Sequence, residues 1–203
     1  MINFITLCDY TGTFAFAISG IRLASAKQFD WFGAYVIGVV TAVGGGTLRD
    51  ILLNTTPFWM EQESYLIISA LALLFVIIFR KYVISLNNTF FIFDAIGLGL
   101  FGVVGIEKAL SFGFPMWVAI VMGTITGAFG GMIRDILINE VPLIFRKDIY
   151  ALACVLGGVV YYVCMLLSFS PPLTQLIAAA SIFITRALAV KYHISVPVLK
   201  GEE

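Results

Sequence analysis

Charge, cysteine and histidine are all scarce in this chain, and each shortage excludes a class of protein. Charged residues make up 12% of the 203 positions, and twelve basic residues balance twelve acidic ones. A formal net charge of zero lacks the basic surface that nucleic-acid binding needs. The three cysteines show no C-x-x-C spacing and His193 is the single histidine, so we expect no disulfide framework, no metal site and no cofactor. No grouping of nucleophile and base indicates an enzyme.

Apolar residues dominate what remains. Hydrophobic residues account for 61% of the chain and the mean hydropathy is +1.03, whereas soluble domains contain about 45–50% apolar residues. We therefore expect an all-α integral membrane protein, embedded in a lipid bilayer and without room for a soluble domain. A helix needs about 20 apolar residues to cross a bilayer. On that basis the chain contains seven candidate spans, near 3–23, 33–53, 65–84, 90–109, 116–138, 149–168 and 173–190.

The basic residues between the spans predict an orientation. If seven helices alternate in direction, the connections around Lys27, Arg80 and Arg146 and the C-terminal tail fall on one side of the membrane. The other side receives only Lys108. Because basic connections favour the cytoplasm, we expect the N-terminus outside and the C-terminus inside.

The first half of the sequence is repeated in the second at an offset of 85 residues. Identical residues at this offset run through both halves: Asp9 and Asp94, Gly20 and Gly105, Thr41 and Thr126, Arg49 and Arg134, Asp50 and Asp135, Asn54 and Asn139, Pro57 and Pro142, and Tyr65 and Tyr150. A duplicated unit of three spans enters the membrane from the opposite side, which gives an inverted repeat. We expect a first repeat over 1–88, a second, inverted repeat over 89–169, and a seventh helix with a cytoplasmic tail over 170–203.

Glycine clusters fall inside the second and fifth spans. Glycine costs about 0.8–1 kcal/mol relative to alanine within a helix, so Gly44, Gly45 and Gly46, and likewise Gly130 and Gly131, are expected to break these helices. A broken turn frees carbonyl groups, which must face protein or a hydrated cavity. The alternative is that the glycines only allow close packing of helices.

Hydroxyl side chains share a helix face with these glycines. Thr41 precedes Gly45 by four positions, and Thr126 precedes Gly130 by four, so each pair lies on one face of its helix. We expect the two faces to line a common path. Phe129 stands where the first glycine of the second cluster would be. Its ring either narrows the path or packs against lipid.

The predicted spans contain six charged residues in two sets of three: Asp9, Arg49 and Asp50, and Asp94, Arg134 and Asp135. A charge at membrane depth costs about 2.5–3.5 kcal/mol, so such residues are usually functional. Neighbours in sequence do not face each other on a helix, which means that each arginine needs a partner other than the aspartate beside it. Equal depth favours pairing Asp9 with Arg49, and Asp94 with Arg134. The other carboxylate of each set is then left to attract cations, unless all six charges only hold helices together.

Three segments resemble the prokaryotic branch of the trimeric intracellular cation channel family, which is also named a glycine transporter family. They are DYTGTFAFAISG at 9–20, GGGTLRDIL at 44–52 and GGMIRDILINEVP at 130–142. The resemblance covers both repeats. It implies a homotrimer in the prokaryotic plasma membrane, in which each protomer has its own pore between the glycine-broken second and fifth helices. It also implies conduction of potassium and other monovalent cations, with hinges at the two glycine clusters.

Three functions are compatible with these patterns. The first is a passive channel for potassium and sodium, in which Asp50 and Asp135 supply a negative field. The second is a secondary transporter of glycine or another small zwitterion, because a free helix end binds a carboxylate and an aspartate binds an ammonium group. The third is a scaffold without transport.

Overall fold

The computed structural model describes residues 4–79 and 89–197. In these ranges the chain forms eight α-helices and one short 3-10 helix. They are α1 (Phe4–Ala26), α2 (Trp31–Leu52), α3 (Phe58–Glu61), α4 (Ser64–Ile78), α6 (Thr89–Ser111), α7 (Met116–Leu137), η1 (Leu143–Phe145), α8 (Ala151–Leu166) and α9 (Pro171–Lys191). Positions 80–84 of the third predicted span, and the repeat boundary at 88, lie outside the described residues.

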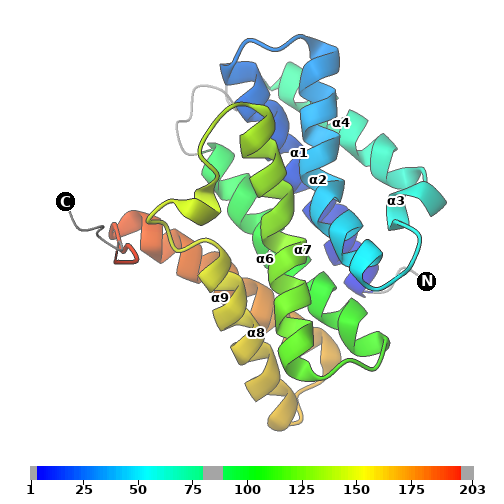
Figure 1. The fold of residues 1–203 in the computed structure, drawn as a ribbon, viewed down its shortest axis with the longest axis vertical. Coiled ribbons are helices and arrows are strands. Elements are labelled where there is room, and N and C mark those ends of the chain that lie inside the picture. Colours follow the sequence, from blue (N-terminus) through cyan, green and yellow to red (C-terminus); the bar gives the residue numbers. More distant parts are fainter. Residues whose placement is uncertain (1–3, 80–88, 198–203) are drawn as a thin grey trace.

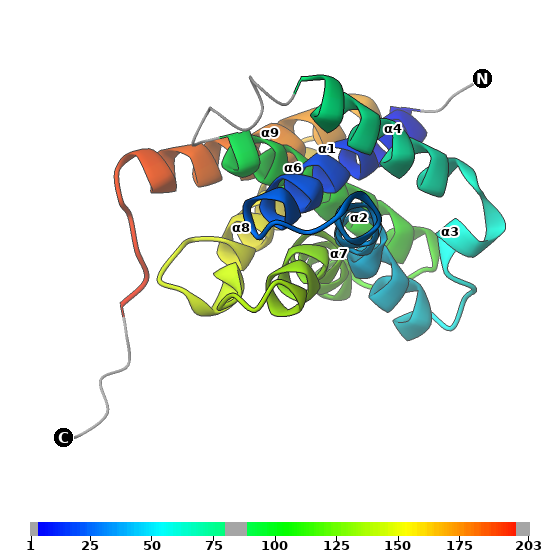
Figure 2. The ribbon, with the colours of Figure 1, turned by 90° about the horizontal axis from the view of Figure 1, so that it is seen from above.

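Four long helices form the centre of the molecule (Figures 1 and 2). α1 packs against α2 and α6, and α7 packs against the same two helices. α4 covers α1 and α2 on one side, while α8 and α9 cover α6 and α7 on the other. The start of α1 lies beside the ends of α2 and α6, and the end of α7 lies beside the start of α6. The centre therefore has two ends that are built from different helix termini.

Five of the helices have the length and hydropathy needed to cross a membrane: α1, α2, α6, α7 and α9. Their bounds agree with the predicted spans to within a few residues. The third and sixth predicted spans correspond to α4 and α8, which are apolar but contain 15 and 16 residues. At 1.5 Å per residue these helices are shorter than a hydrocarbon core of about 30 Å. The protein is an all-helical membrane protein with five long apolar spans and two shorter apolar helices.

Helix packing in the two halves follows the same pattern. Gly20 on α1 leaves room for the Thr41 hydroxyl of α2, and Gly105 on α6 leaves room for the Thr126 hydroxyl of α7. A Cβ atom on either glycine would collide with that threonine and with backbone of the neighbouring helix. Small residues thus allow two helix backbones to approach, which is how helices commonly associate in membranes.

The ends of α2 and α7 are also built alike. Asn54 and Asn139 each follow the last helical turn in the left-handed conformation, with φ of 56° and 58°. Asparagine tolerates this conformation better than most residues. Pro57 and Pro142 then introduce the short helices α3 and η1. The same residue types at an offset of 85 positions therefore give the same local structure.

The glycine clusters do not break their helices, which corrects the sequence-based expectation. α2 is helical from Trp31 to Leu52 and α7 from Met116 to Leu137 without interruption. A bilayer offers the backbone no competing hydrogen-bond partners, so the helical bonds persist despite the low helix propensity of glycine. The clusters instead permit contact between helices, since Gly45 lies against the carbonyl of Thr126 and Gly130 against that of Thr41.

Candidate functional site

Each arginine of the repeated pair binds the aspartate that follows it in the sequence. Arg49 Nε donates to Asp50 Oδ1 at 2.8 Å, and Arg134 Nε donates to Asp135 Oδ1 at 2.9 Å. The expectation that these neighbours do not bind each other was wrong, although Arg134 also has a second partner on another helix. The Cα–Cβ bonds of the two neighbours do diverge. The long arginine side chain nevertheless curls back around its own helix, so that the Nε edge of its guanidinium group faces the aspartate.

The second oxygen of each aspartate accepts a backbone hydrogen bond from the next short helix. Asp50 Oδ2 binds the amide of Phe58 at 2.9 Å, and Asp135 Oδ2 binds the amide of Leu143 at 3.0 Å. Both carboxylates are buried, with exposures of 1% and 3%. They are thus occupied in holding α3 and η1 against the ends of α2 and α7, which conflicts with the expectation that they are left free to attract cations.

Asp94 pairs with Arg134, as the sequence predicts. Asp94 Oδ1 lies 2.6 Å from Arg134 Nη1, and both side chains are completely buried. The same nitrogen donates to Ser19 Oγ on α1 at 2.8 Å. The guanidinium group also lies 5.0 Å from the ring centre of Phe90. Three helices and an aromatic ring therefore enclose this ion pair.

Asp9 does not pair with Arg49, and this prediction was wrong. No ion pair joins Asp9 to any residue in the described ranges. Asp9 Oδ2 instead accepts a hydrogen bond of 2.5 Å from the Tyr65 hydroxyl on α4. We refer below to Asp9, Arg49, Asp50 and Tyr65 as the Asp9 site, and to their counterparts Asp94, Arg134, Asp135 and Tyr150 as the Asp94 site.

A cavity of about 560 Å³ reaches the Asp9 site. We call this cavity the vestibule. It is lined by the start of α1, the ends of α2 and α6, α3, and the starts of α4 and α9. Its walls carry three carboxylates, Asp9, Glu61 and Glu107, against the cations Arg49 and Lys108. Arg49 is bound to Asp50, and none of the three carboxylates forms an ion pair with a described residue. Asp9 is the one that lies where the vestibule meets the Asp9 site.

A narrow crevice, too small to admit a water molecule, adjoins the vestibule. Asp9 and Arg49 belong to both, and the crevice continues to Gly46, Phe101 and Thr126. It brings together the predicted path residue Thr126 and the charged residues from α1 and α2. The crevice lies among α1, α2, α3 and α6 and reaches α7 at Thr126.

The predicted path residues are packed closely where α2 crosses α7. Gly44 lies near Ile133, and the Gly45–Thr126 and Gly130–Thr41 contacts bring backbone against backbone. Both threonine hydroxyls donate within their own helices, Thr41 to Ile37 at 2.6 Å and Thr126 to Met122 at 2.7 Å. Phe129 is partly buried and lines neither the vestibule nor the crevice. Gly131 leaves space that the Tyr150 hydroxyl occupies.

The sequence-based predictions did not include two polar residues, Glu107 and Arg186. Glu107 on α6 accepts hydrogen bonds from Tyr161 at 2.6 Å and Gln175 at 2.5 Å, which fastens α8 and α9 to the vestibule wall. Arg186 on α9 is buried, with 2% exposure, and donates to the carbonyl of Ile149 at 2.9 Å. Arg186 lies inside the seventh predicted span. A charge at membrane depth is costly, and this could have identified the residue in the sequence.

Comparison with known proteins places the chain in a family. A sequence profile described as "Glycine transporter" matches residues 6–81 and 91–165. The chain belongs to the glycine transporter family. Members of the family include the inner membrane protein YadS of Escherichia coli strain K12, to which the chain is 37% identical over 199 residues, covering 96% of each sequence.

Solved structures of similar proteins share the fold of this glycine transporter family member. One is the trimeric intracellular cation (TRIC) channel orthologue from Rhodobacter sphaeroides, with a TM-score of 0.87 and 35% identity over 94% of this chain and 98% of that one. Another is a prokaryotic TRIC channel studied in 0.5 M KCl, with a TM-score of 0.87 and 33% identity over 97% and 100% of the two chains. The fold is therefore that of the prokaryotic TRIC channels.

Proposed function

We propose that the protein conducts potassium and sodium ions through a pathway inside each protomer. The pathway starts in the vestibule, passes Asp9, follows the crevice to Thr126, and would continue from there between α2 and α7 to the Asp94 site. The observation that carries the proposal is the carboxylate of Asp9, which lines a cavity of about 560 Å³ at membrane depth without an ion pair among the described residues. Ionisable residues in such positions commonly mark ion pathways.

The charges around Asp9 support a preference for cations. Arg49 is neutralised by Asp50 at 2.8 Å, so it adds little positive field to the vestibule. The Tyr65 hydroxyl donates to Oδ2 of Asp9, and no described residue donates to Oδ1. Clefts lined by one sign of charge raise the local concentration of the opposite ion. Asp9, Glu61 and Glu107 outnumber the remaining vestibule cation, Lys108, and would thus gather cations at the entrance.

The pathway is closed in this conformation, and the closure involves two sets of contacts. α2 and α7 touch through Gly45 and Gly130 at the centre. Beyond this contact, the ion pair of Asp94 with Arg134 fills the space that corresponds to the end of the vestibule. Conduction requires that both separate, and the glycines, which have no side chains to interlock, allow α2 to move past α7.

The sequence repeats and the relatives support proposals for the repeat organisation, the membrane orientation and the oligomeric state of the protein. We propose inverted repeats over 1–88 and 89–169, with 170–203 as an additional helix and a cytoplasmic tail. The vestibule would open outside the cell, because the basic connections near Lys27 and Arg146 lie at the opposite end. The Rhodobacter sphaeroides relative is trimeric, and YadS is an inner membrane protein. We propose a homotrimer in the inner membrane.

Potassium flux into liposomes containing the purified protein tests the proposal. Asp9→Asn should lower the flux by about tenfold or more, because a unit charge about 4 Å from a cation contributes roughly 4 kcal/mol at an effective dielectric constant near 20. Glu63→Gln removes a charge from an exposed position that does not line the vestibule, and it serves as the matched control. Equal flux through the wild type and Asp9→Asn would rule out Asp9 as a pathway residue.

Transport of a small zwitterion such as glycine is the second candidate. Arg49 and Asp9 line the same cavity without binding each other, which places a group for a carboxylate beside a group for an ammonium ion. Saturable exchange of labelled glycine without an ohmic potassium current would favour this function. A potassium current in the absence of any amino acid would favour the channel.

A further inference from the structure

Arg186 is a buried cation that neither repeat accounts for, because α9 has no counterpart among the first six predicted spans. Its guanidinium carbon lies 4.9 Å from the ring centre of Tyr150 and 5.2 Å from that of Phe91. No carboxylate in the described residues pairs with it, and its Nε makes no hydrogen bond there. Its one hydrogen bond within that part of the chain goes to the carbonyl of Ile149. Arg186 thus holds the segment that precedes α8 through a backbone bond and a tyrosine ring.

Tyr150 behaves differently from its counterpart Tyr65. The Tyr65 hydroxyl donates to Asp9, whereas the Tyr150 hydroxyl makes no hydrogen bond with the described residues and lies over Gly131. Asp94 Oδ2 is also without a partner among them. A buried hydroxyl and a buried carboxylate oxygen in one site therefore do not meet, although leaving either unsatisfied costs free energy.

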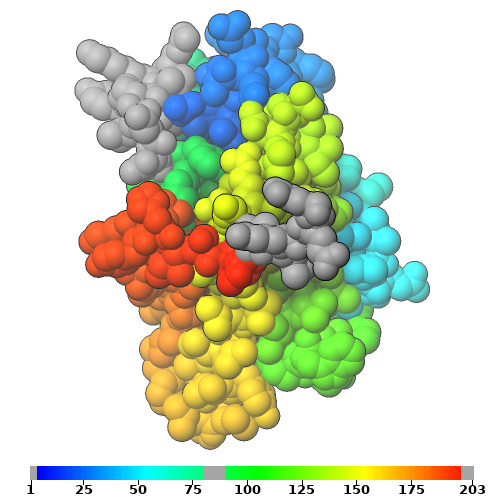
Figure 3. Space-filling model, turned by 60° about the vertical axis from the view of Figure 1, so that its left-hand side comes forward, coloured from blue at the N-terminus to red at the C-terminus, as the bar shows by residue number. Residues whose placement is uncertain are grey.

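The surroundings of the two rings explain the difference. Arg186 lies over the Tyr150 ring, while no cation lies over the Tyr65 ring in the described part of the chain. A cation above an aromatic face is attracted by the ring, and more strongly when both are removed from water. The additional helix α9 therefore fixes one tyrosine and leaves the other free to bind its aspartate. Figure 3 shows the red residues that follow α9 against the yellow segment that leads into α8, and Val196 donates to the Lys147 carbonyl there at 2.9 Å.

We propose that Arg186 is a positioning residue that keeps the Asp94 site closed by holding the Tyr150 hydroxyl away from Asp94. Asp94 then binds Arg134 instead of Tyr150, and the end of the pathway opposite the vestibule stays shut. Without Arg186, the tyrosine binds Asp94 as Tyr65 binds Asp9, and Arg134 loses its partner on α6. The inference rests on the proposed function, because it concerns the opening of that pathway.

Cysteine labelling provides a test that needs no ion flux. Ser19 is completely buried beside Arg134, and its counterpart at the offset of 85 is Val104, which lines the vestibule. A water-soluble thiol reagent is applied to Ser19→Cys and Val104→Cys in a background whose native cysteines, Cys8, Cys154 and Cys164, are replaced by alanine. Arg186→Gln should accelerate labelling at position 19 by on the order of tenfold, the change expected from losing a buried cation–π contact. Labelling at position 104 should stay unchanged.

Further variants separate a positioning role from general loosening of the fold. Adding Tyr150→Phe to Arg186→Gln removes the hydroxyl that captures Asp94, so labelling at position 19 should return toward its original rate. Arg186→Lys keeps a cation near the ring and should restore most of the protection. Lys191→Gln, which removes an exposed cation from the same helix, is the matched control and should change nothing. Faster labelling at both positions, or no reversal by Tyr150→Phe, would overturn the proposal.

Parallel flux measurements distinguish the two proposals. Absence of potassium flux in the wild type and in every variant, with the labelling pattern as expected, would overturn the proposed function and leave the role of Arg186 standing. Potassium flux that depends on Asp9, with labelling at position 19 unaffected by Arg186→Gln, would overturn the role of Arg186 alone.

Discussion

The Asp9 site and the Asp94 site contain the same four residue types at the same spacing, but they adopt different arrangements. At the Asp9 site the aspartate binds a tyrosine and faces the vestibule. At the Asp94 site the aspartate binds an arginine and no water reaches the pair, whose side chains are 0% exposed. The same carboxylate thus has a different partner in each site, and we propose that the partner decides whether the site is open or shut. Identical residues in the two repeats therefore do not have to adopt the same arrangement of side chains.

Residues outside the repeated set account for the difference. Phe58 covers Gly46 and packs edge to face against Tyr65 at 4.4 Å, whereas its smaller counterpart Leu143 leaves the space over Gly131 to Tyr150.

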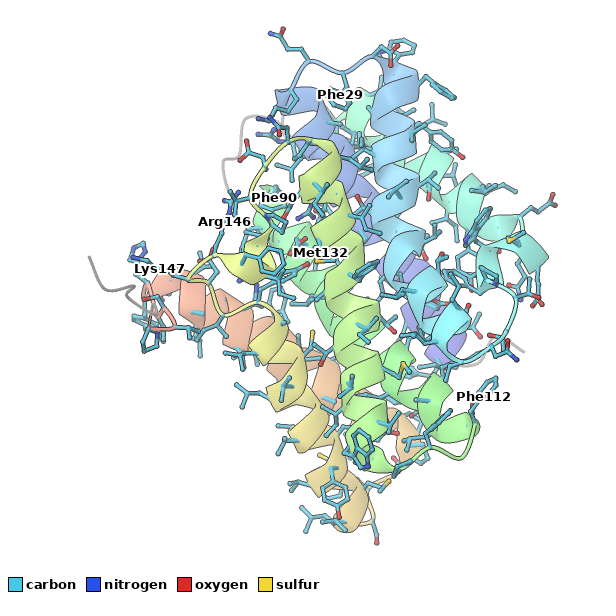
Figure 4. All side chains as sticks on the ribbon, viewed as in Figure 1. Phe29, Phe90, Phe112, Met132, Arg146 and Lys147 are labelled. Carbon is cyan, nitrogen blue, oxygen red and sulfur yellow. The ribbon has the colours of Figure 1, made fainter. Side chains whose placement is uncertain are left out.

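The charges at the two ends of the molecule differ as well. Glu61 at the vestibule corresponds to Arg146, which Figure 4 shows with Lys147 near Phe90, at the opposite end of α6 from Phe112. On the proposed pathway, an acidic entrance and a basic far end would favour cations entering at the vestibule.

Loss of Arg134 should have the largest effect on stability. Arg134→Gln leaves two buried carboxylates, Asp94 and Asp135, without a cation, and breaking a buried ion pair costs about 3–5 kcal/mol. Arg49→Gln strands only Asp50, so its cost should be smaller. Thermal unfolding in detergent measures both. A larger loss for Arg49→Gln would contradict the difference between the two sites.

Removal of the tyrosine hydroxyls should give the next largest contrast. Tyr65→Phe deletes a hydrogen bond to the Asp9 carboxylate, which is worth about 1.5–3 kcal/mol. Tyr150→Phe deletes a hydroxyl that has no partner among the described residues, and it should leave the stability unchanged or raise it. The same unfolding assay compares the two variants. Equal destabilisation by both variants would show that the two tyrosine hydroxyls contribute equally to stability.

Exchange of Phe58 for leucine should make the Asp9 site resemble the Asp94 site. The variant loses an edge-to-face contact with Tyr65 worth about 0.5–1.5 kcal/mol, and it frees the space over Gly46. Tyr65 should then move away from Asp9, which releases the carboxylate to Arg49 and lowers potassium flux several-fold. Flux at the wild-type level would show that Phe58 does not determine the position of Tyr65.

A surface ion pair should give the smallest effect, and one that depends on pH. Lys27 Nζ lies 2.6 Å from Glu140, and this hydrogen bond lowers the pKa of the exposed Glu140 carboxyl below its ordinary value of 4.5. A lowered pKa stabilises the fold above the unfolded value, and the contribution disappears as the pH falls through the folded pKa. Lys27→Met should therefore shift the unfolding temperature slightly at pH 7 and not at pH 3. An equal shift at both pH values would point to packing by the lysine stem.

The sequence predicts much of the fold, because apolar length and charge placement depend on local physics. The seven apolar segments, the repeat and the Asp94–Arg134 pair could all be found in this way. The course of the glycine-rich helices could not, since the surrounding helices and the lipid override the low helix propensity of Gly44 to Gly46. The choice of partner for Asp9 was also out of reach, because it depends on how Phe58 and Tyr65 pack in three dimensions.

Potassium flux through liposomes containing Asp9→Asn or Asp94→Asn, each compared with the wild type, tests the central claim most directly. The two substitutions are chemically identical and lie at equivalent positions of the repeats. Asp9→Asn should lower the flux because it removes the cation-attracting carboxylate of the vestibule. Asp94→Asn should raise the flux because it weakens the ion pair that closes the far end. Arg134 would still pair with Asp135. A decrease of similar size in both variants would contradict the assignment of one open and one closed site.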